Sequence, residues 1–155
     1  MAFQNINEIL DFAIDKEIEA AEFYESISRE EYMSGKKEML LEFAAEERKH
    51  QKLLENFKAG DTATNFDNYE FKWITDLKRS DYIVDLEYSP GMPYNELLML
   101  AMKREEKSLS LYNQLLENSD SEDSKKLFKM LCQEEAKHKL TLETIYDDYM
   151  AEMGD

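Results

Sequence analysis

The chain is 155 residues long, with 35% charged and 43% hydrophobic residues, only four glycines and two prolines, and a formal net charge of −16. That length suits one domain over residues 1–155 with a continuous core, and the scarcity of turn residues excludes an all-β fold. The negative charge argues against nucleic acid as a partner, because a polyanion would be repelled, and it favours cations and metal ions. The alternative is that the acidic residues only keep the surface soluble.

Cysteine chemistry and membrane insertion are also excluded. Cys132 is the one cysteine of the chain, so it has no internal disulfide partner and no second thiolate for a zinc or iron site. The first residues lack a basic segment followed by an apolar run, and no stretch approaches the about 18 uncharged apolar residues of a membrane span. We therefore expect a cytoplasmic protein that does not insert into membranes.

The first half of the chain predicts two helices. Asn5 and Glu8 fit a capping box, and apolar residues then recur at helical spacing, which predicts a helix over about 5–31. The stretch MSGK, residues 33–36, is expected to break that helix. A second apolar stripe predicts the next helix over about 36–59.

The helical periodicity is lost over residues 60–92, which hold most of the turn residues and are expected to form a long connector. A short helix near residues 74–83 is one possibility within it. Pro93 suits the first turn of a third helix over about 93–118, and a fourth is predicted over about 121–152. The connector aromatics, expected to pack the connector against the helices rather than to bind a ligand, are Phe66, Tyr69, Phe71 and Trp73.

Four helices joined by a short, a long and a short connection predict an all-α fold, a four-helix bundle. Its helix pairs cover about 5–59 and 93–152, and residues 60–92 form one crossover between the second and third helices. Because a crossover must travel the length of the bundle, a connector of this size does not require a second domain.

The two helix pairs are related by an internal repeat. Shifting the sequence by 88 residues aligns the halves without a gap in either pair and places Glu17 on Glu105. The same shift places EERKH, residues 46–50, on EEAKH, residues 134–138. Most other positions differ, so the residues that the halves share are concentrated at a few polar positions.

These polar residues lie inside apolar helix faces. Positions 40, 43, 47, 50, 54 and 57 step by three and four, as one helix face must, and read Leu, Phe, Glu, His, Leu and Phe. The equivalent face of each other helix is likewise mostly apolar around one glutamate or one Glu-x-x-His pair, and the face of the third helix also includes Ser108. The residues predicted to point at the bundle axis are Glu17, Glu47, His50, Glu105, Glu135 and His138.

Four buried carboxylates require compensation. An unpaired buried carboxylate costs several kcal/mol or takes up a proton, and few Lys or Arg residues fall on these faces. Two divalent cations would cancel four glutamate charges, and each neutral imidazole would donate a lone pair. The pattern therefore predicts a site for two metal ions.

The sequence resembles the ferritin-like dimetal-carboxylate family, and most closely its rubrerythrin-like branch. One Glu from each of two helices and a Glu-x-x-His motif from each of the others is that family's pattern. The resemblance implies a ferritin-like bundle and a diiron centre with Glu17, Glu47, His50, Glu105, Glu135 and His138 as ligands. Which carboxylates bridge the ions stays open. The segments that carry the resemblance are FAIDKEIEAAEFYE, FAAEERKHQKLLE, LAMKREEKSLSLY and LCQEEAKHKLTLETIYDDY.

Two departures qualify the resemblance. Rubrerythrins usually carry a four-cysteine rubredoxin module after the bundle, which these 155 residues lack, so we expect an external electron donor such as a rubredoxin-like protein. Members with peroxidase activity also carry a further glutamate one turn after the first on the third helix, where this chain has Ser108. An exchange of that glutamate for a histidine at the iron is therefore not expected.

Three functions fit these residues. The first is a diiron oxidoreductase that reduces hydrogen peroxide or dioxygen, in the setting of oxidative stress, with no catalytic residue beyond the metal ligands. The second is iron handling or storage, with the site acting as a ferroxidase. The third is a structural metal. Iron is expected from the resemblance, although the ligands alone do not rank it above manganese or zinc.

Other shared residues support the site less directly. Tyr24 and Tyr112 lie two turns after Glu17 and Glu105 on the same faces, and we expect them to donate hydrogen bonds to ligand carboxylates, plain core packing being the alternative. The shared Glu46 and Glu134 point about 100° away and are expected on a solvated face. The last helix continues beyond the site, which favours a homodimer.

Overall fold

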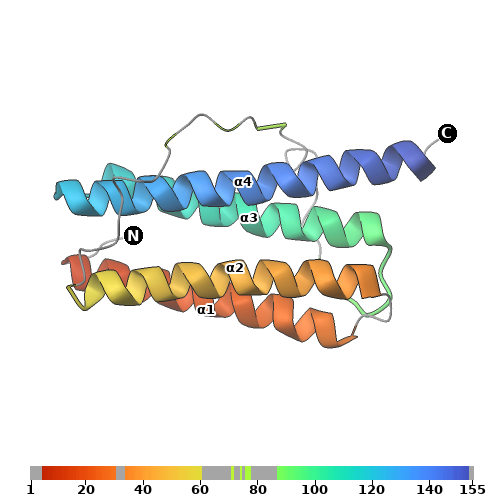
Figure 1. Ribbon diagram of the computed structural model, residues 1–155, viewed down its shortest axis with the longest axis horizontal. Helices are drawn as coiled ribbons and strands as arrows, with labels where there is room; N and C mark the ends of the chain where they lie inside the picture. The colour runs from red at the N-terminus through yellow and green to blue at the C-terminus, as the bar shows by residue number, and fades with distance from the viewer. Residues whose placement is uncertain are drawn as a thin grey trace. The chain divides into compact units, whose positions relative to one another are not determined.

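The structure is a computed structural model that describes residues 5–30, 34–60, 71, 74, 76, 77 and 87–153. Within these ranges it consists of four α-helices with no β-strand, which confirms the all-α prediction (Figure 1). None of the described helices is long and apolar enough to cross a membrane. The helices are α1 (Ile6–Glu30), α2 (Ser34–Lys58), α3 (Tyr94–Glu117) and α4 (Glu122–Met153).

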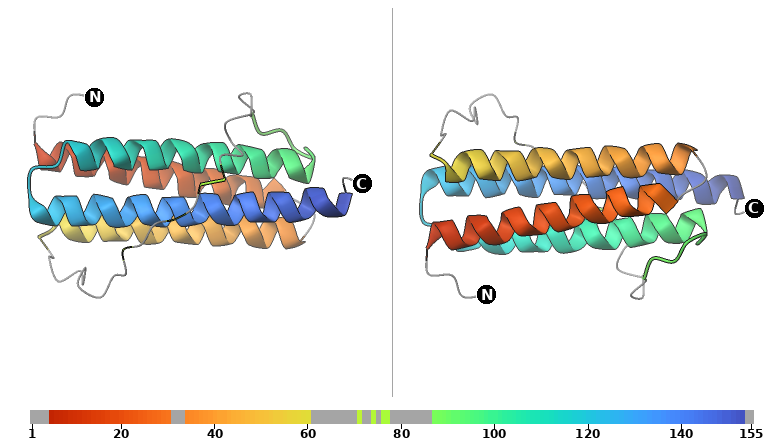
Figure 2. Two further views of the ribbon diagram at one scale, coloured as in Figure 1. Left: turned by 90° about the horizontal axis from the view of Figure 1, so that it is seen from above. Right: turned by 90° about the horizontal axis from the view of Figure 1, so that it is seen from below.

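The chain divides into two compact units, Met1–Asn65 and Phe66–Asp155. In the first unit α1 packs on α2, and in the second α3 packs on α4. Within each pair the second helix runs back along the first, as the colour gradient in Figures 1 and 2 shows. Each unit is thus an antiparallel helical hairpin built from one copy of the sequence repeat.

The start of α1 follows the predicted capping pattern. The backbone N–H of Glu8 donates to the side-chain oxygen Oδ1 of Asn5 at 3.0 Å, which satisfies one of the N–H groups that a helix start leaves without an intrahelical acceptor. The α2 helix begins at Ser34, inside the MSGK stretch, rather than at residue 36 as predicted. Serine and glycine are tolerated there because the first helical turn gains little from intrahelical hydrogen bonds.

The predicted apolar stripes form the core of the first unit. Leu10, Ala13 and Tyr24 on α1 and Leu40 and Leu54 on α2 are all buried. Spacing of three and four residues places them on one side of each helix, so the two stripes pack together and bury their apolar surface. The ends of the hairpin are held by an ion pair between Lys58 and Asp11.

The second unit is built in the same way. Pro93 occupies the cap position just before α3 rather than the first helical position, one residue from the prediction. Ser121 caps α4, because its hydroxyl accepts a hydrogen bond from the backbone N–H of Ser124 at 3.1 Å. The rings of Tyr94 and Tyr149 pack edge to face, with their centres 5.1 Å apart, and this contact joins the start of α3 to the last turns of α4.

Three connector residues, Phe71, Asp76 and Leu77, contact α4. The ring of Phe71 lies 4.8 Å from the Lys129 ammonium, which agrees with the packing role predicted for the connector aromatics; Phe66, Tyr69 and Trp73 lie outside the described residues. Oδ1 of Asp76 in the connector pairs with the ammonium nitrogen of Lys139, which also belongs to α4, at 2.6 Å. Of the short helix proposed near 74–83, the described positions 74, 76 and 77 are not helical. The N–H of Leu77 instead donates to the Glu143 carboxylate at 3.3 Å, so an external acceptor replaces a helical one.

Candidate metal site

The first unit brings together one glutamate from α1 and a Glu-x-x-His pair from α2. Nδ1 of His50 lies 3.6 Å from Oε1 of Glu17 and 3.8 Å from Oε2 of Glu47. Glu47 and His50 share a face because they are three residues apart on a helix, and Glu17 reaches them from the middle of the neighbouring helix. Two carboxylates and one imidazole thus converge inside this hairpin.

The second unit repeats that arrangement. Nδ1 of His138 on α4 lies 3.7 Å from Oε2 of Glu105 on α3 and 4.0 Å from Oε2 of Glu135. Each distance is close to its counterpart in the first unit, so the sequence repeat is also a repeat of side-chain geometry. We call the sets Glu17, Glu47, His50 and Glu105, Glu135, His138 the two half-sites.

The half-sites are buried. The four glutamates each expose 2% or less of their surface to solvent, and His50 exposes 4%. His138 is slightly more accessible, with 13% of its side-chain surface exposed. Apolar residues lie next to them on the same faces, including Leu54 and Leu142, both at 0%. Carboxylates in such surroundings interact strongly with any nearby charge, because little water is present to screen it.

Burial changes the acidity of the first half-site. The pKa of Glu17 is raised from 4.5 to about 8, chiefly by loss of hydration and then by the hydrogen bond and the repulsion from Glu47, while His50 acts in the opposite direction. Without added positive charge the folded protein therefore favours a proton on Glu17 at neutral pH. A divalent cation would replace that proton and allow both carboxylates to be anionic.

The donor sets fit a transition-metal ion. In each half-site one oxygen of each glutamate and one ring nitrogen of the histidine lie within 4.8 Å of one another. Carboxylate oxygen with imidazole nitrogen suits iron, manganese or zinc, and the absence of a thiolate among these six residues argues against a purely soft-metal site. Each half-site could therefore supply three ligands to a metal.

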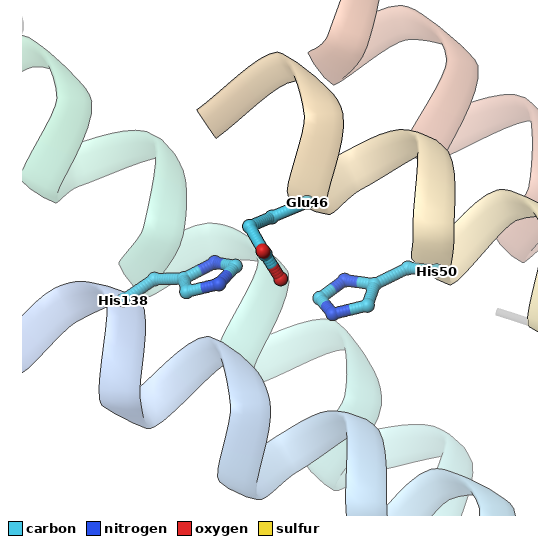
Figure 3. Close-up of side chains that lie close together, drawn as sticks. All are labelled: Glu46, His50 and His138. Carbon is cyan, nitrogen blue, oxygen red and sulfur yellow. The ribbon is translucent and has the colours of Figure 1, made fainter. Parts of the chain in front are cut away.

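Glu46 and Glu134 are half-buried and carry ion pairs with lysines of their own helices. Glu46 pairs with Lys49 and Glu134 with Lys137, each at 3.0 Å and each within one helical turn. An oxygen of Glu46 also lies within 4.8 Å of a ring nitrogen of His50, as the spacing of four residues along one helix allows. Figure 3 shows Glu46 and His50 leaving α2 one turn apart and His138 leaving α4.

The two predicted supporting tyrosines are core residues. Tyr24 and Tyr112 are each 1% exposed, and their rings pack against Phe43 and Phe128 at centroid distances of 5.7 and 6.4 Å. Both tyrosines are thus packed in the core, although their ring partners Phe43 and Phe128 are not counterparts in the repeat. Hydrogen bonding of their hydroxyls to the glutamates stays a prediction.

Two helical hairpins that each bury one Glu and one Glu-x-x-His pair match the residue pattern of dimetal-carboxylate helical bundles. The family comparison agrees: the sequence model of Rubrerythrin matches residues 8–146, and the chain belongs to the rubrerythrin family. The ferritin-like four-helix bundle predicted from the sequence is confirmed as the fold class.

The search of solved structures gives a related chain. A hypothetical protein from Pyrococcus furiosus is 28% identical, with a TM-score of 0.63, over 93% of this chain and 89% of its own. The search of curated proteins gives no match. The family and fold therefore rest on similarity along nearly the whole chain, whereas the activity must be argued from the site.

Proposed function

We propose that the protein is a diiron-carboxylate oxidoreductase that reduces hydrogen peroxide or dioxygen with electrons from a separate donor. The observation that carries the proposal is the pair of matched, buried half-sites, each with two carboxylates and one imidazole within 4.8 Å. Membership of the rubrerythrin family supports iron as the metal. The ligands proposed are Glu17, Glu47, His50, Glu105, Glu135 and His138.

In this proposal the two half-sites together hold two ferrous ions. The four carboxylates bear four negative charges, which two divalent ions neutralise, and the imidazoles bind in their neutral form. When bound, the two ferrous ions supply the two electrons that convert hydrogen peroxide and two protons into two water molecules. A rubredoxin-like protein or another external donor would return these electrons.

The residues of the chain contribute binding, charge and exclusion of water. Glu17 gives up its proton when a metal ion binds, because its pKa is raised in the folded protein only while no cation balances the two carboxylates. Buried leucines at positions 54 and 142 keep bulk water away from the histidines one turn earlier. Such an apolar surrounding protects a reactive centre from side reactions.

Anaerobic loading followed by rapid mixing tests the proposal. Protein loaded with ferrous iron should hold about two ions per chain and should be oxidised by peroxide in well under a second. The variant Glu47→Ala should lose both properties, whereas Glu19→Ala, at an exposed position of α1, should keep both. Slow and partial oxidation of fully loaded protein would reject peroxide reduction as the function.

Iron handling is the second candidate, and the net charge of −16 favours it, because an acidic surface concentrates ferrous ions near the protein. Here iron is the substrate, oxidised at the same residues. The same loading experiment separates the two: uptake far beyond two ions per chain supports storage, and saturation at two supports the oxidoreductase. Elemental analysis of protein from its native host identifies the metal.

A further inference from the structure

A cavity of about 370 Å³ lies in the second unit, between α3 and α4 and beside the connector. Leu109, Leu116 and Ala136 line it from the helices, and Ile74 lines it from the connector. Apolar atoms make up most of the cavity surface. A cavity of about 150 Å³ is large enough to bind benzene, and small-molecule pockets begin near 300 Å³. We call it the α3–α4 cavity.

The internal repeat shows that this cavity is particular to the second unit. At the offset of 88 residues Ala136 corresponds to Arg48, and Asn113 to Glu25. In the first unit the Arg48 guanidinium donates hydrogen bonds to Glu25 at 2.8 Å and to Gln51 at 2.9 Å, so its long side chain occupies the groove between the two helices. In the second unit a methyl group stands in that place, and the space is open.

The cavity also contains a fixed cation. Lys139, the counterpart of Gln51, has a side chain that is 3% exposed, and its ammonium pairs with Oδ1 of Asp76 at 2.6 Å. Asp76 belongs to the connector, and its side chain is 42% exposed. Lys139 on α4 thus holds its charge in the cavity wall, whereas the carboxylate that pairs with it comes from the connector and is partly exposed to solvent. Another carboxylate could replace Asp76 without leaving the buried ammonium unpaired.

The other polar groups of the wall include a second cation, Lys129, whose ammonium lies 4.8 Å from the centre of the Phe71 ring. The Glu143 carboxylate, also in the wall, accepts the N–H of Leu77 at 3.3 Å. Cys132 donates its thiol hydrogen to Oδ1 of Asn113 at 3.5 Å, and burial raises the pKa of that thiol to about 12, so it adds no charge. Exchanging one carboxylate for another at Lys139 therefore leaves the charge of the cavity unchanged.

We propose that the α3–α4 cavity binds a small monocarboxylate with an apolar chain, whose carboxylate pairs with Lys139 in place of Asp76 and whose chain lies against Leu109, Leu116 and Ala136. This inference goes beyond the proposed function and does not depend on a metal. The net charge of −16 repels anions at long range, but salt near 0.15 M screens exposed charges beyond about 8 Å and affects a buried pair much less.

Calorimetric titration of the full chain with hexanoate at that salt concentration tests the proposal. We expect saturable binding of one hexanoate per chain, and binding of the uncharged analogue hexanamide at least about tenfold weaker, because a charge-assisted hydrogen bond is roughly twice as strong as a neutral one. The variant Ala136→Arg, which copies Arg48, should abolish binding. The matched variant Arg48→Ala in the first unit should leave the affinity unchanged.

A second variant gives a change of the opposite sign. Asp76→Asn removes the competing carboxylate and should bind hexanoate several-fold more tightly than the natural chain. Absence of saturable binding to the natural chain would overturn the proposal, and binding that survives Ala136→Arg would overturn its location. Equal affinity for hexanoate and hexanamide, or weaker binding to Asp76→Asn, would overturn the role of Lys139. Urea unfolding of each variant, measured in parallel, reports whether the fold is intact.

Discussion

Glu17 makes metal-free protein sensitive to pH in a direction opposite to that of a paired surface carboxylate. Its pKa is about 8 in the folded protein, against 4.5 for an ordinary glutamate, so the folded state holds a proton that the unfolded state has released. At about 1.4 kcal/mol per pKa unit the whole difference amounts to about 5 kcal/mol. Glu17→Gln replaces the protonated carboxyl by a neutral amide of similar shape.

The sign follows from proton binding in the two states. Below pH 4.5 both states are protonated and Glu17 has no effect, and as the pH rises toward 8 the unfolded state alone loses its proton, so the free energy of unfolding falls. Between pH 5 and pH 8 this loss is on the order of a few kcal/mol, a large part of the about 5–15 kcal/mol of a typical domain. Glu17→Gln should lack this loss.

Urea unfolding of chelator-treated protein at pH 5 and pH 8 measures the difference. The natural chain should lose a few kcal/mol more than Glu17→Gln over this interval, on the order of 1.4 kcal/mol for each pKa unit of the shift. Glu19→Gln, whose side chain is 63% exposed on the same helix, should behave like the natural chain. Identical pH dependence in the natural chain and in Glu17→Gln would refute the assignment of the effect to burial. With metal bound, the natural chain should instead be more stable at pH 8 than at pH 5, since the ion stabilises the anionic form of Glu17.

Three further predictions address other parts of the molecule. His50→Ala should lower the metal content measured by elemental analysis, whereas Lys49→Ala, at a side chain that is 71% exposed, should not; equal contents would remove His50 from the site. Asp76→Ala should lower the urea unfolding free energy by about 1–3 kcal/mol, because Lys139 would keep a buried charge, and an unchanged value would show that the ammonium reaches water. Tyr112→Phe should weaken metal binding about 10–100-fold in competition with a chelator if its hydroxyl holds a ligand carboxylate, and an unchanged affinity would leave only a packing role.

Helix positions were predictable because one apolar stripe recurs along each helix. Residues such as Leu40 and Leu54 are buried where the spacing placed them, and Asn5 caps α1 as its sequence indicated. The start of α2 was missed by two residues, since serine and glycine in a first helical turn resemble a break. Local patterns therefore fix helix centres better than helix ends.

The connector and the cavity were not predictable from local patterns. Around Asp76 the sequence resembles a short helix, but Lys139 and Glu143, more than sixty residues later, bind its side chain and the neighbouring N–H. The cavity depends on what stands opposite Ala136, and an alanine in a helix has no signal of its own. The one available signal was the repeat, because Arg48 occupies the corresponding position in the other half.

The repeat also separates residues kept for packing from residues kept for chemistry. A core position such as Leu54 or Leu142 can be filled by many apolar side chains at small cost, so a leucine in both halves has a sufficient explanation in stability alone. A buried glutamate has no such explanation, because it lowers the stability of the metal-free fold, as the pKa of Glu17 shows. Other positions differ between the halves, as at Arg48 and Ala136, which lie between the helices of their units. Shared carboxylates that oppose folding, in halves that differ almost everywhere else, are what a bound cation would require, and stability alone would have replaced them.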